Sequence, residues 1–386
     1  SLRLHQRSSR PASLNAIMTR LQRRSPDEGL TLPAAMHPLL QRVYRQRGLT
    51  GEQELDLALA NLIPPHELLG MATAVDLLVA ALDHQRRVLI VSDFDADGAT
   101  SCALAVSALQ DFGFRHVDYI VPNRFDFGYG LTPKIVDELA KGKEPDLIIT
   151  VDNGISSVAG VQAAKQIGSQ VLITDHHLAP ETLPEADAIV NPNQQGCSFK
   201  SKAIAGVGVI FYVMLALRGR LRELGRFESG LSEPNMAALL DLIALGTIAD
   251  VVPLDHNNRI LVAEGLRRIR AGKARPGIQA LLQVAGKNTA ALTASDLAFG
   301  VGPRLNAAGR LDDMTTGIEC LLSEHADTAY QLALQLDSMN QDRKQIEADM
   351  RQQAFESLAE FEFNESDLPN SFCLLDRKST RLNSSH

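Results

Sequence analysis

Four apolar segments of this chain end in aspartate or histidine, and the first of them restricts the fold most. The β-branched run Val88–Ser92 is followed by three aspartates at alternate positions, Asp93, Asp95 and Asp97, and then by Gly98 and a run of small residues that favours a helix. A short, continuous apolar run of this kind is typical of a buried strand in a parallel sheet. Ligands of α/β sheets bind beyond the carboxyl ends of the strands, so we expect the three carboxylates to lie at a binding site.

Three later apolar segments repeat this order. The polar residues at their ends are Asp152, then Asp175 with His176 and His177, and then Asp250. Clustered carboxylates repel one another unless a cation neutralises them, and oxygen with imidazole ligands suits Mn²⁺, or Mg²⁺ where water completes the shell. A solvated turn or a hydrogen-bonded structural histidine would explain one such segment. Four segments together favour a divalent metal site.

The motifs Ser92-Asp-Phe-Asp-Ala-Asp-Gly, Val151-Asp-Asn-Gly and Thr174-Asp-His-His resemble the signature motifs of the DHH phosphoesterase superfamily. Within it, four further segments resemble the RecJ family of single-strand-specific exonucleases. They are Val121–Gly130, Ala205–Tyr212, Ala244–Leu254 and Gly302–Leu311. The resemblance runs in the expected order from about Leu32 to about Asp376.

The resemblance implies an α/β fold, in which a parallel β-sheet flanked by helices precedes a helical region and a long connector helix. It also implies a metal-dependent exonuclease that degrades single-stranded DNA from the 5′ end and releases 5′-mononucleotides. The implied setting is recombinational and mismatch repair in a bacterial cytoplasm. Single-strand-binding protein and a helicase are the expected protein partners.

Resemblance and spacing together nominate the ligands of a two-metal site (Mn²⁺ or Mg²⁺), which can supply what phosphodiester hydrolysis needs. The expected direct ligands are Asp95, Asp97, Asp152, His176 and Asp250. Asp152 is expected to bridge the cations, because its strand should lie beside the first motif. Asp93 is expected at the site as a further ligand or as a group that orients one. His177 would orient or protonate the phosphate, and Asp175 would either orient a histidine or simply form a turn.

Contacts with the substrate are expected from two other segments. By resemblance, a loop carrying Arg304, Asn306 and Arg310 binds DNA phosphate, since arginine forks match phosphate geometry. An ordinary surface loop is nearly as good an explanation of those residues. Arg124 and Tyr129 would contact phosphate and stack on a base, although a tyrosine in that position could simply be partly buried.

Strand and helix patterns alternate from residue 87 to residue 174, which predicts a parallel sheet with right-handed crossovers. Strands are expected at 87–92, 117–121, 146–151 and 170–174, and helices at 71–84, 99–112, 132–141 and 156–167. Residues 203–218 and 235–249 are expected to form buried helices. Gly206 and Gly208 do not make a dinucleotide fingerprint, because Phe211 stands where the third glycine would be, and close helix packing explains them better.

The expected organisation has seven parts. They are a disordered basic segment (1–30), an N-terminal helical region (31–86), the catalytic α/β domain (87–255), its helical extension (256–322), the connector helix (323–362), the start of a second, truncated domain (363–376) and a foreign tail (377–386). The last part is interpreted as foreign because it fits no continuation of the family pattern.

Composition adds few constraints. No apolar run approaches the ~20 residues of a membrane span, and the four cysteines are scattered without a CxxC pair, which favours a reducing cytoplasm over a zinc site or disulfides. The net charge of −8 is unusual for a nucleic-acid enzyme. Cations bound to a carboxylate cluster would offset part of that charge.

Three other functions remain open on the sequence alone. A DHH phosphoesterase acting on short oligoribonucleotides, cyclic dinucleotides or pyrophosphate would share the metal site. A catalytically inactive DNA-binding fragment would share the fold. A receiver-type signalling domain also clusters acids at strand ends, but it would not need the Asp-His-His set.

Overall fold

The computed structural model describes residues 32–47, 49, 51–123, 127–142, 144–228, 230–311 and 313–359. The chain divides into two compact units, residues 1–56 and 57–386. In the first unit, helix α1 (Pro38–Gln46) occupies the helical stretch expected there and begins at proline, and Leu32 and Leu49 form a small buried cluster. The parts expected at 1–30 and 363–386 lie outside the described residues.

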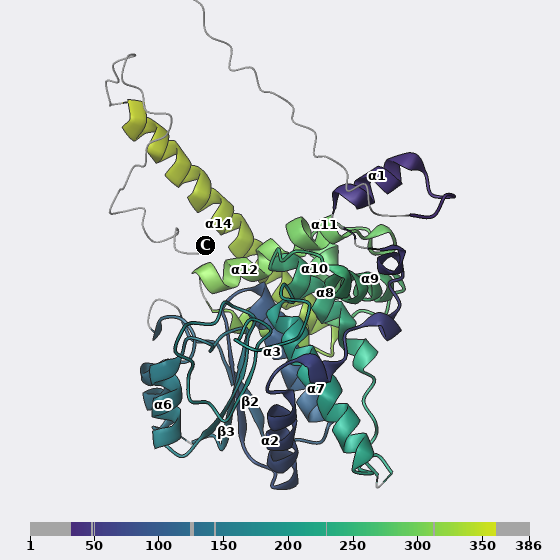
Figure 1. Cartoon of the computed structure of the whole chain (residues 1–386). Helices are drawn as coiled ribbons and strands as arrows, with labels where there is room; N and C mark the ends of the chain where they lie inside the picture. Colours follow the sequence, from purple (N-terminus) through teal and green to yellow (C-terminus); the bar gives the residue numbers. More distant parts are fainter. Residues whose placement is uncertain are drawn as a thin grey trace, which may run out of the picture. The chain divides into compact units, whose positions relative to one another are not determined.

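Five parallel strands form the sheet of the second unit, in the order β2-β1-β3-β4-β5 (Figure 1). The strands are β1 (Val88–Ser92), β2 (Val117–Ile120), β3 (Leu147–Val151), β4 (Gln170–Thr174) and β5 (Ala188–Val190). The parallel sheet is therefore confirmed, with its first four strands where the sequence predicts them. The fifth strand was missed, because three residues are too few to show a period.

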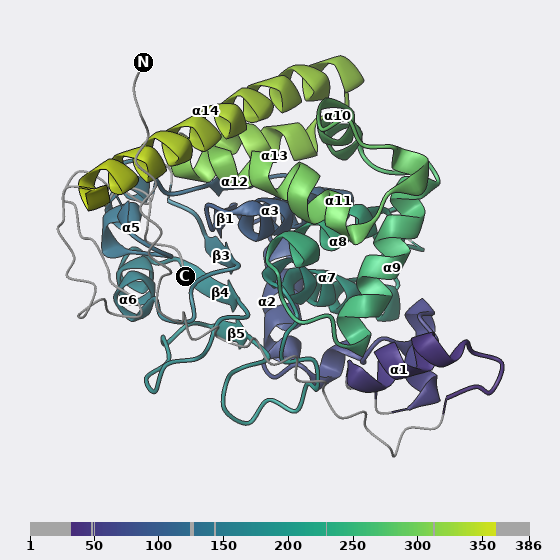
Figure 2. The same ribbon diagram turned by 90° about the horizontal axis from the view of Figure 1, so that it is seen from above.

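Each face of the sheet is covered by its own helices. Side chains alternate along a strand, so Val88 and Ile90 of β1 pack in one core while Leu89 and Val91 pack in the other. Figure 2 shows α5 and α6 on one side of the sheet and α2, α3 and α7 on the other. Their bounds are α2 (Met71–Asp83), α3 (Ala96–Asp111), α5 (Pro133–Leu139), α6 (Val158–Gln166) and α7 (Gly206–Glu223).

A helical half follows the sheet in the sequence and packs on α3 and α7. Its helices are α8 (Leu240–Ala249), α9 (His256–Arg270), α10 (Pro276–Val284), α11 (Ala294–Asp296), α12 (Gly302–Leu311), α13 (Thr315–Leu322) and α14 (Ala326–Ala359). The long helix α14 packs along α10, α12 and α13 (Figure 2). It occupies the stretch where a connector helix was expected.

The segment Gly302–Leu311 corrects one expectation, because it is helix α12 and not a loop. A single π-helical turn, Leu297–Val301, leads directly into it. Pro303 directly follows this π-helical turn, where the regular hydrogen-bond ladder is already interrupted, so its missing N–H is tolerated. Glycines weaken a helix, but a Cβ at Gly309 would overlap the carbonyl oxygen of Phe94. The glycine that suggested a loop is thus required by tertiary packing.

No single helix in the described part of the chain is both long and apolar enough to cross a membrane. Among the described residues, one pair of helical segments, Leu59–Glu67 and Met71–Asp83, bent by 86°, meets that criterion when the two are joined, by length and composition alone.

Candidate active site

The turn between β1 and α3 is built around the carboxylate of Asp95. This residue caps the helix: its Oδ1 accepts the N–H groups of Asp97 and Gly98 at 2.9 and 3.0 Å. With this cap the helix begins at Ala96, three residues before the predicted start. A Cβ at Gly98 would lie 2.5 Å from the carbonyl oxygen of Asp93, so the turn requires glycine there.

Asp97 connects this turn to the start of α7. Its carboxylate accepts the backbone N–H groups of Gly206 and Val207 at 2.6 and 3.0 Å, and it is almost completely buried. A helix N-terminus favours an anion, because its first N–H groups lack partners and the helix dipole is positive there. A Cβ at Gly206 would lie 2.5 Å from Oδ1 of Asp152, so this glycine lets the helix approach two carboxylates at once.

Asp152 leaves the end of β3, which pairs with β1 as expected. Its φ of +61° lies in the left-handed region that non-glycine residues seldom adopt. The Nε2 atom of His176 lies 3.1 Å from Oδ1 of Asp152, 3.6 Å from Oδ2 of Asp250 and 3.9 Å from Oδ2 of Asp97. Four segments that are far apart in the sequence thus meet within a few ångströms.

These side chains form three overlapping groups of potential metal ligands. Within each group, one ligand atom per residue lies within 4.8 Å of the others. The groups are Asp93, Asp95 and Asp152; Asp97, His176 and Asp250; and Asp152, His176 and His177. Oδ1 of Asp152, Nε2 of His176 and Oδ2 of Asp250 are buried without a hydrogen-bond partner among the described residues. Buried polar atoms are rarely left without partners, and these donors fit a hard divalent cation.

The electrostatics of the apoprotein also favour a cation. Burial, and then the charge of Asp95, raise the pKa of Asp97 to about 7. Burial, and then the charge of Asp97, raise the pKa of Asp250 to about 8. The pKa of Asp152 is raised well above its usual value by burial and by the neighbouring carboxylates. Burial and the charge of His177 lower the pKa of His176 to about 4, so its imidazole is neutral near pH 7, as a metal ligand must be.

The pKa of His177 is shifted in the opposite direction to that of His176. Burial works against its charge, but the hydrogen bond and the charge of Asp175 outweigh burial and raise its pKa to about 9. Its Nδ1 lies 2.7 Å from Oδ1 of Asp175, whose second oxygen accepts the N–H of Ile155 at 2.9 Å. The Tyr129 hydroxyl lies 3.4 Å from the same imidazole. The site therefore pairs a neutral histidine with a cationic one, and Asp175 holds the cationic one in place.

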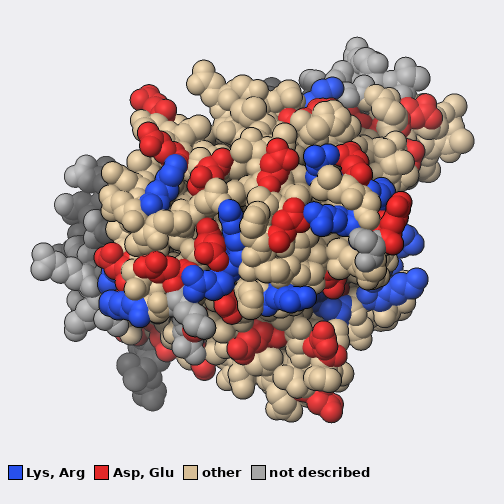
Figure 3. Space-filling model, turned by 90° about the horizontal axis from the view of Figure 1, so that it is seen from below, with Lys and Arg blue, Asp and Glu red and all other residues tan. Residues whose placement is uncertain are grey.

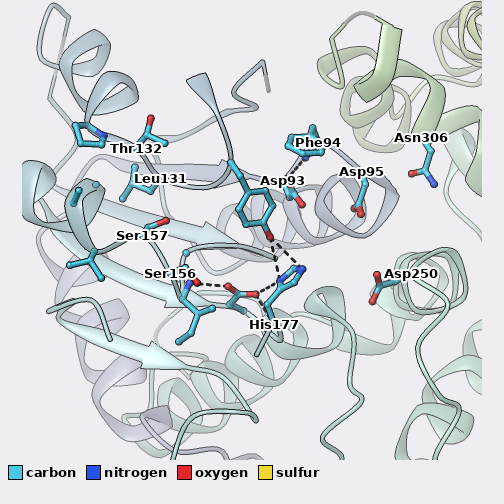
Figure 4. Close-up of a pocket in the computed structure, with 18 of the residues that line it drawn as sticks. Asp93, Phe94, Asp95, Leu131, Thr132, Ser156, Ser157, His177, Asp250 and Asn306 are labelled. Atoms are coloured by element: carbon cyan, nitrogen blue, oxygen red, sulfur yellow. Dashed lines mark hydrogen bonds and ion pairs between the residues drawn. The ribbon is translucent and has the colours of Figure 1, made fainter. Parts of the chain in front are cut away.

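The acidic cluster opens into a cavity of about 1080 Å³ (Figure 4). Asp93, Asp95, His177 and Asp250 face it from one side, and the loops before α5 and α6 form the other. Several residues expected to contact substrate also line it, namely Tyr129, Asn306 and Arg310.

One of the expected substrate contacts, Arg304, does not line this cavity. Arg304 is mostly buried, donates to the carbonyl oxygen of Gly300, and lies 2.7 Å from Asp337 of α14. Arg124 lies outside the described residues. The expectation that Arg304 faces the substrate overlooked this ion pair, because α14 is distant in the sequence.

Sequence reasoning attributed Gly206 to close helix packing without linking it to an acidic residue, and it missed Gly246. Gly206 lies against Asp152, and a Cβ at Gly246 of α8 would lie 2.8 Å from Oδ1 of Asp97. No local signal marks these positions, since a glycine inside a helix pattern has several explanations. Only the packed helices show that side chains there would displace the carboxylates.

The net charge of −8 does not describe how charges are distributed over the surface. Figure 3 shows one face of the molecule with basic and acidic side chains interspersed. That face presents no extended area of one sign. The local environment of the cavity therefore matters more for an anionic ligand than the net charge does.

The chain was compared with known proteins. Residues 87–247 match the model of the DHH family, N-terminal domain. The chain is 55% identical to the single-stranded-DNA-specific exonuclease RecJ of Dickeya dadantii and 52% identical to that of Escherichia coli. Each match covers 92% of this chain and 61% of the relative, so the chain spans about three fifths of their length.

Solved structures give a similar result. A crystal structure of exonuclease RecJ bound to manganese superposes with a TM-score of 0.66 at 35% identity, covering 74% of this chain and 69% of that one. RecJ from Thermus thermophilus in complex with Mn²⁺ gives a TM-score of 0.67 at 34% identity, over 80% of this chain and 43% of that one.

Proposed function

The chain belongs to the DHH family and, within it, to the RecJ exonucleases, and from that premise we propose that it hydrolyses single-stranded DNA with the help of divalent cations. We further propose that it works from the 5′ end and releases 5′-mononucleotides. The relatives are named as single-stranded-DNA-specific exonucleases. The direction of degradation rests on the resemblance to that family.

The observation that carries the proposal is the shared position of Asp152. It belongs to one group of potential ligands with Asp93 and Asp95, and to another with His176. Two-metal sites hold their cations about 3.5–4 Å apart, and a carboxylate shared by two groups of potential ligands could serve both. We propose Asp95, Asp97, Asp152, His176 and Asp250 as the ligands, with Asp93 as a further one.

Bound cations would neutralise charge on the phosphate and make a water more acidic. The chain itself would contribute two further functions. His177, held by Asp175 and charged below a pKa of about 9, can donate a hydrogen bond to a phosphate oxygen facing the cavity. Tyr129 and Arg310 line the same cavity, where they would stack on a base and pair with phosphate.

Biological partners follow from the same proposal. Single-stranded DNA would be the substrate, and single-strand-binding protein and a helicase would supply it during recombination and repair. We also infer a cytoplasmic location, as expected from the resemblance.

The testing experiment uses a single-stranded oligonucleotide with a 5′ phosphate and an internal label. Purified chain with Mn²⁺ or Mg²⁺ should release mononucleotides stepwise from the 5′ end. Chelator should abolish the release, and blunt duplex should resist it. An Asp97→Asn variant serves as the matched inactive control.

Other outcomes would contradict the proposal in different ways. Cleavage confined to short oligoribonucleotides or cyclic dinucleotides would indicate a different DHH phosphoesterase. Binding of the metal and of DNA without cleavage would indicate a DNA-binding fragment. Failure to bind either cation would contradict the site assignment itself.

A further inference from the structure

The N-terminus of α3 is capped from two directions. The N–H groups of its first turn have no partner inside the helix. The side chain of Asp95 accepts those of Asp97 and Gly98, and its backbone carbonyl accepts the N–H of Ala99 as the first regular bond of the helix. The N–H of Ala96 is satisfied by Oδ1 of Asn306 at 2.8 Å, from a residue 210 positions later in the chain.

Helix α12, which carries Asn306, also contacts two of the three segments that present acidic ligands. Gly309 lies directly against the carbonyl oxygen of Phe94, in the middle of the Asp93–Asp97 turn. Gly302 lies against Ala249, the residue before Asp250, with 3.2 Å between a Cβ built there and the alanine Cβ. The contact at Gly309 leaves no room for a side chain and the one at Gly302 leaves little, so the position of α12 and the positions of the acidic residues depend on each other.

We propose that Asn306 is a positioning residue of the metal site. Its amide oxygen fixes the backbone between Asp95 and Asp97, which belong to two different groups of potential ligands. The hydrogen bond thereby sets the spacing of the two carboxylates and holds them close together before a cation binds. This inference rests on the metal site of the proposed function and adds a residue outside the ligand set.

The geometry distinguishes this role from a substrate contact. The amide oxygen of Asn306 accepts the N–H of Ala96, so its NH₂ group is the donor left for an anionic ligand in the cavity that it lines. Groups that orient metal ligands commonly change metal affinity when they are removed. A substrate contact would instead change DNA affinity.

The test is a calorimetric titration of the full chain with Mn²⁺. Asn306→Ala should weaken Mn²⁺ binding by about 10-fold, and activity should approach that of the wild type at saturating Mn²⁺. Asn306→Asp keeps an oxygen acceptor for Ala96 and should bind Mn²⁺ at least as tightly as the wild type. Arg310 lines the same cavity from the same helix. The variant Arg310→Ala is therefore the control and should leave Mn²⁺ affinity unchanged. Far-UV circular dichroism and metal-free melting establish that each variant is folded.

Several results would overturn the inference. Wild-type Mn²⁺ affinity in Asn306→Ala, together with weaker binding of a single-stranded oligonucleotide in chelator, would make Asn306 a substrate contact. Loss of Mn²⁺ affinity in both Asn306→Ala and Asn306→Asp would show that the acceptor oxygen is not what matters. A wild-type chain that does not bind Mn²⁺ would overturn the metal site and this inference with it, whereas an unaffected Asn306→Ala overturns the inference alone.

Discussion

Asp152 combines three conditions that each disfavour an aspartate. It is buried, its φ is +61°, and other carboxylates surround it. Strained backbone and like charges persist where the rest of the fold imposes them, and they are common at functional sites. At the scale of single residues, the apoprotein thus stores unfavourable electrostatics that a divalent cation would remove.

Asp152→Asn separates charge from backbone geometry, because asparagine also tolerates the left-handed region. We expect the substitution to reduce Mn²⁺-dependent hydrolysis by at least about 1,000-fold. We also expect it to raise the melting temperature of the metal-free protein, since one buried charge is removed. Release of nucleotides and thermal unfolding in chelator measure the two effects.

The matched control is Asp137→Asn on the exposed face of α5, which should change neither quantity. An Asp152→Asn protein with wild-type turnover would contradict the bridging role. A lower metal-free melting temperature would contradict the electrostatic argument.

The acidic residues also predict how stability depends on pH without metal. The folded-state pKa values of Asp97 (about 7) and Asp250 (about 8) exceed the usual 3.8, so the folded state binds more protons than the unfolded state between those values. Their stabilising contribution is complete below pH 3.8 and is lost as the pH rises to about 8. His176, lowered to about 4, opposes this trend up to its usual pKa of 6.5. His177, raised to about 9, reinforces it above 6.5.

The free energy of unfolding in chelator should therefore fall most steeply between pH 6.5 and 8. Denaturant titrations at pH 5.5, 7 and 8.5 measure it. The double variant Asp97→Asn, Asp250→Asn should show a much weaker dependence over the same range. A wild-type stability that rises with pH in chelator would refute the assignment of these shifts.

At the scale of elements, α12 connects the acidic site to α14. Asn306 and Gly309 face the β1–α3 turn, while Arg304 pairs with Asp337 of α14 at 2.7 Å. Both side chains of this ion pair are mostly buried, at 14% and 19% exposed. Removing one partner of such a pair leaves the other poorly solvated, so the pair matters more than a surface ion pair.

Arg304→Ala and Asp337→Ala should each lower the free energy of unfolding by about 1–3 kcal/mol. The double variant should lose less than the sum, because the two side chains interact directly. Urea unfolding of the four proteins measures this coupling. Additive losses would show that the pair contributes nothing.

The exposed pair Arg220–Glu223 of α7 provides the comparison. Its truncation should cost about 0.5 kcal/mol or less. DNA binding by Arg304→Ala tests the earlier expectation as well: a weaker salt dependence with unchanged stability would restore its role as a phosphate contact.

At the scale of the whole molecule, metal binding and folding should be linked. The sheet contributes Asp93, Asp152 and His176 from strand ends, and the helical half contributes Asp250. A ligand that binds only the folded state stabilises it by mass action, by about 2.7 kcal/mol at 100 times its Kd. Cations held by ligands from both halves would stabilise the sheet and the helical half together.

We therefore expect Mn²⁺ to raise the melting temperature of the entire unit in one transition, and chelator to reverse the change. Scanning calorimetry with increasing Mn²⁺ measures this effect. Asp97→Asn should greatly reduce the shift, while Asp137→Asn should preserve it. Stabilisation of only part of the unit, seen as a second transition, would show that the halves unfold separately.

The sequence alone determined the parts of this protein that local patterns encode. Short apolar runs predicted four of the strands, and the alternation of these strands with helices predicted a parallel sheet. Because the carboxyl ends of parallel strands share one edge, the positions of Asp97, Asp152 and His176 already indicated that they would meet. The motifs around them were specific enough to indicate the family.

Only the tertiary structure decided the features that depend on contacts between distant segments. Arg304 faces Asp337 and not the cavity, and Asn306 caps a helix that begins 210 residues earlier. The glycines of α12 suggested a loop because a glycine's local preference contains no information about the neighbour that will occupy the space beside it. That neighbour, the carbonyl of Phe94, is defined only when the helix packs against the turn.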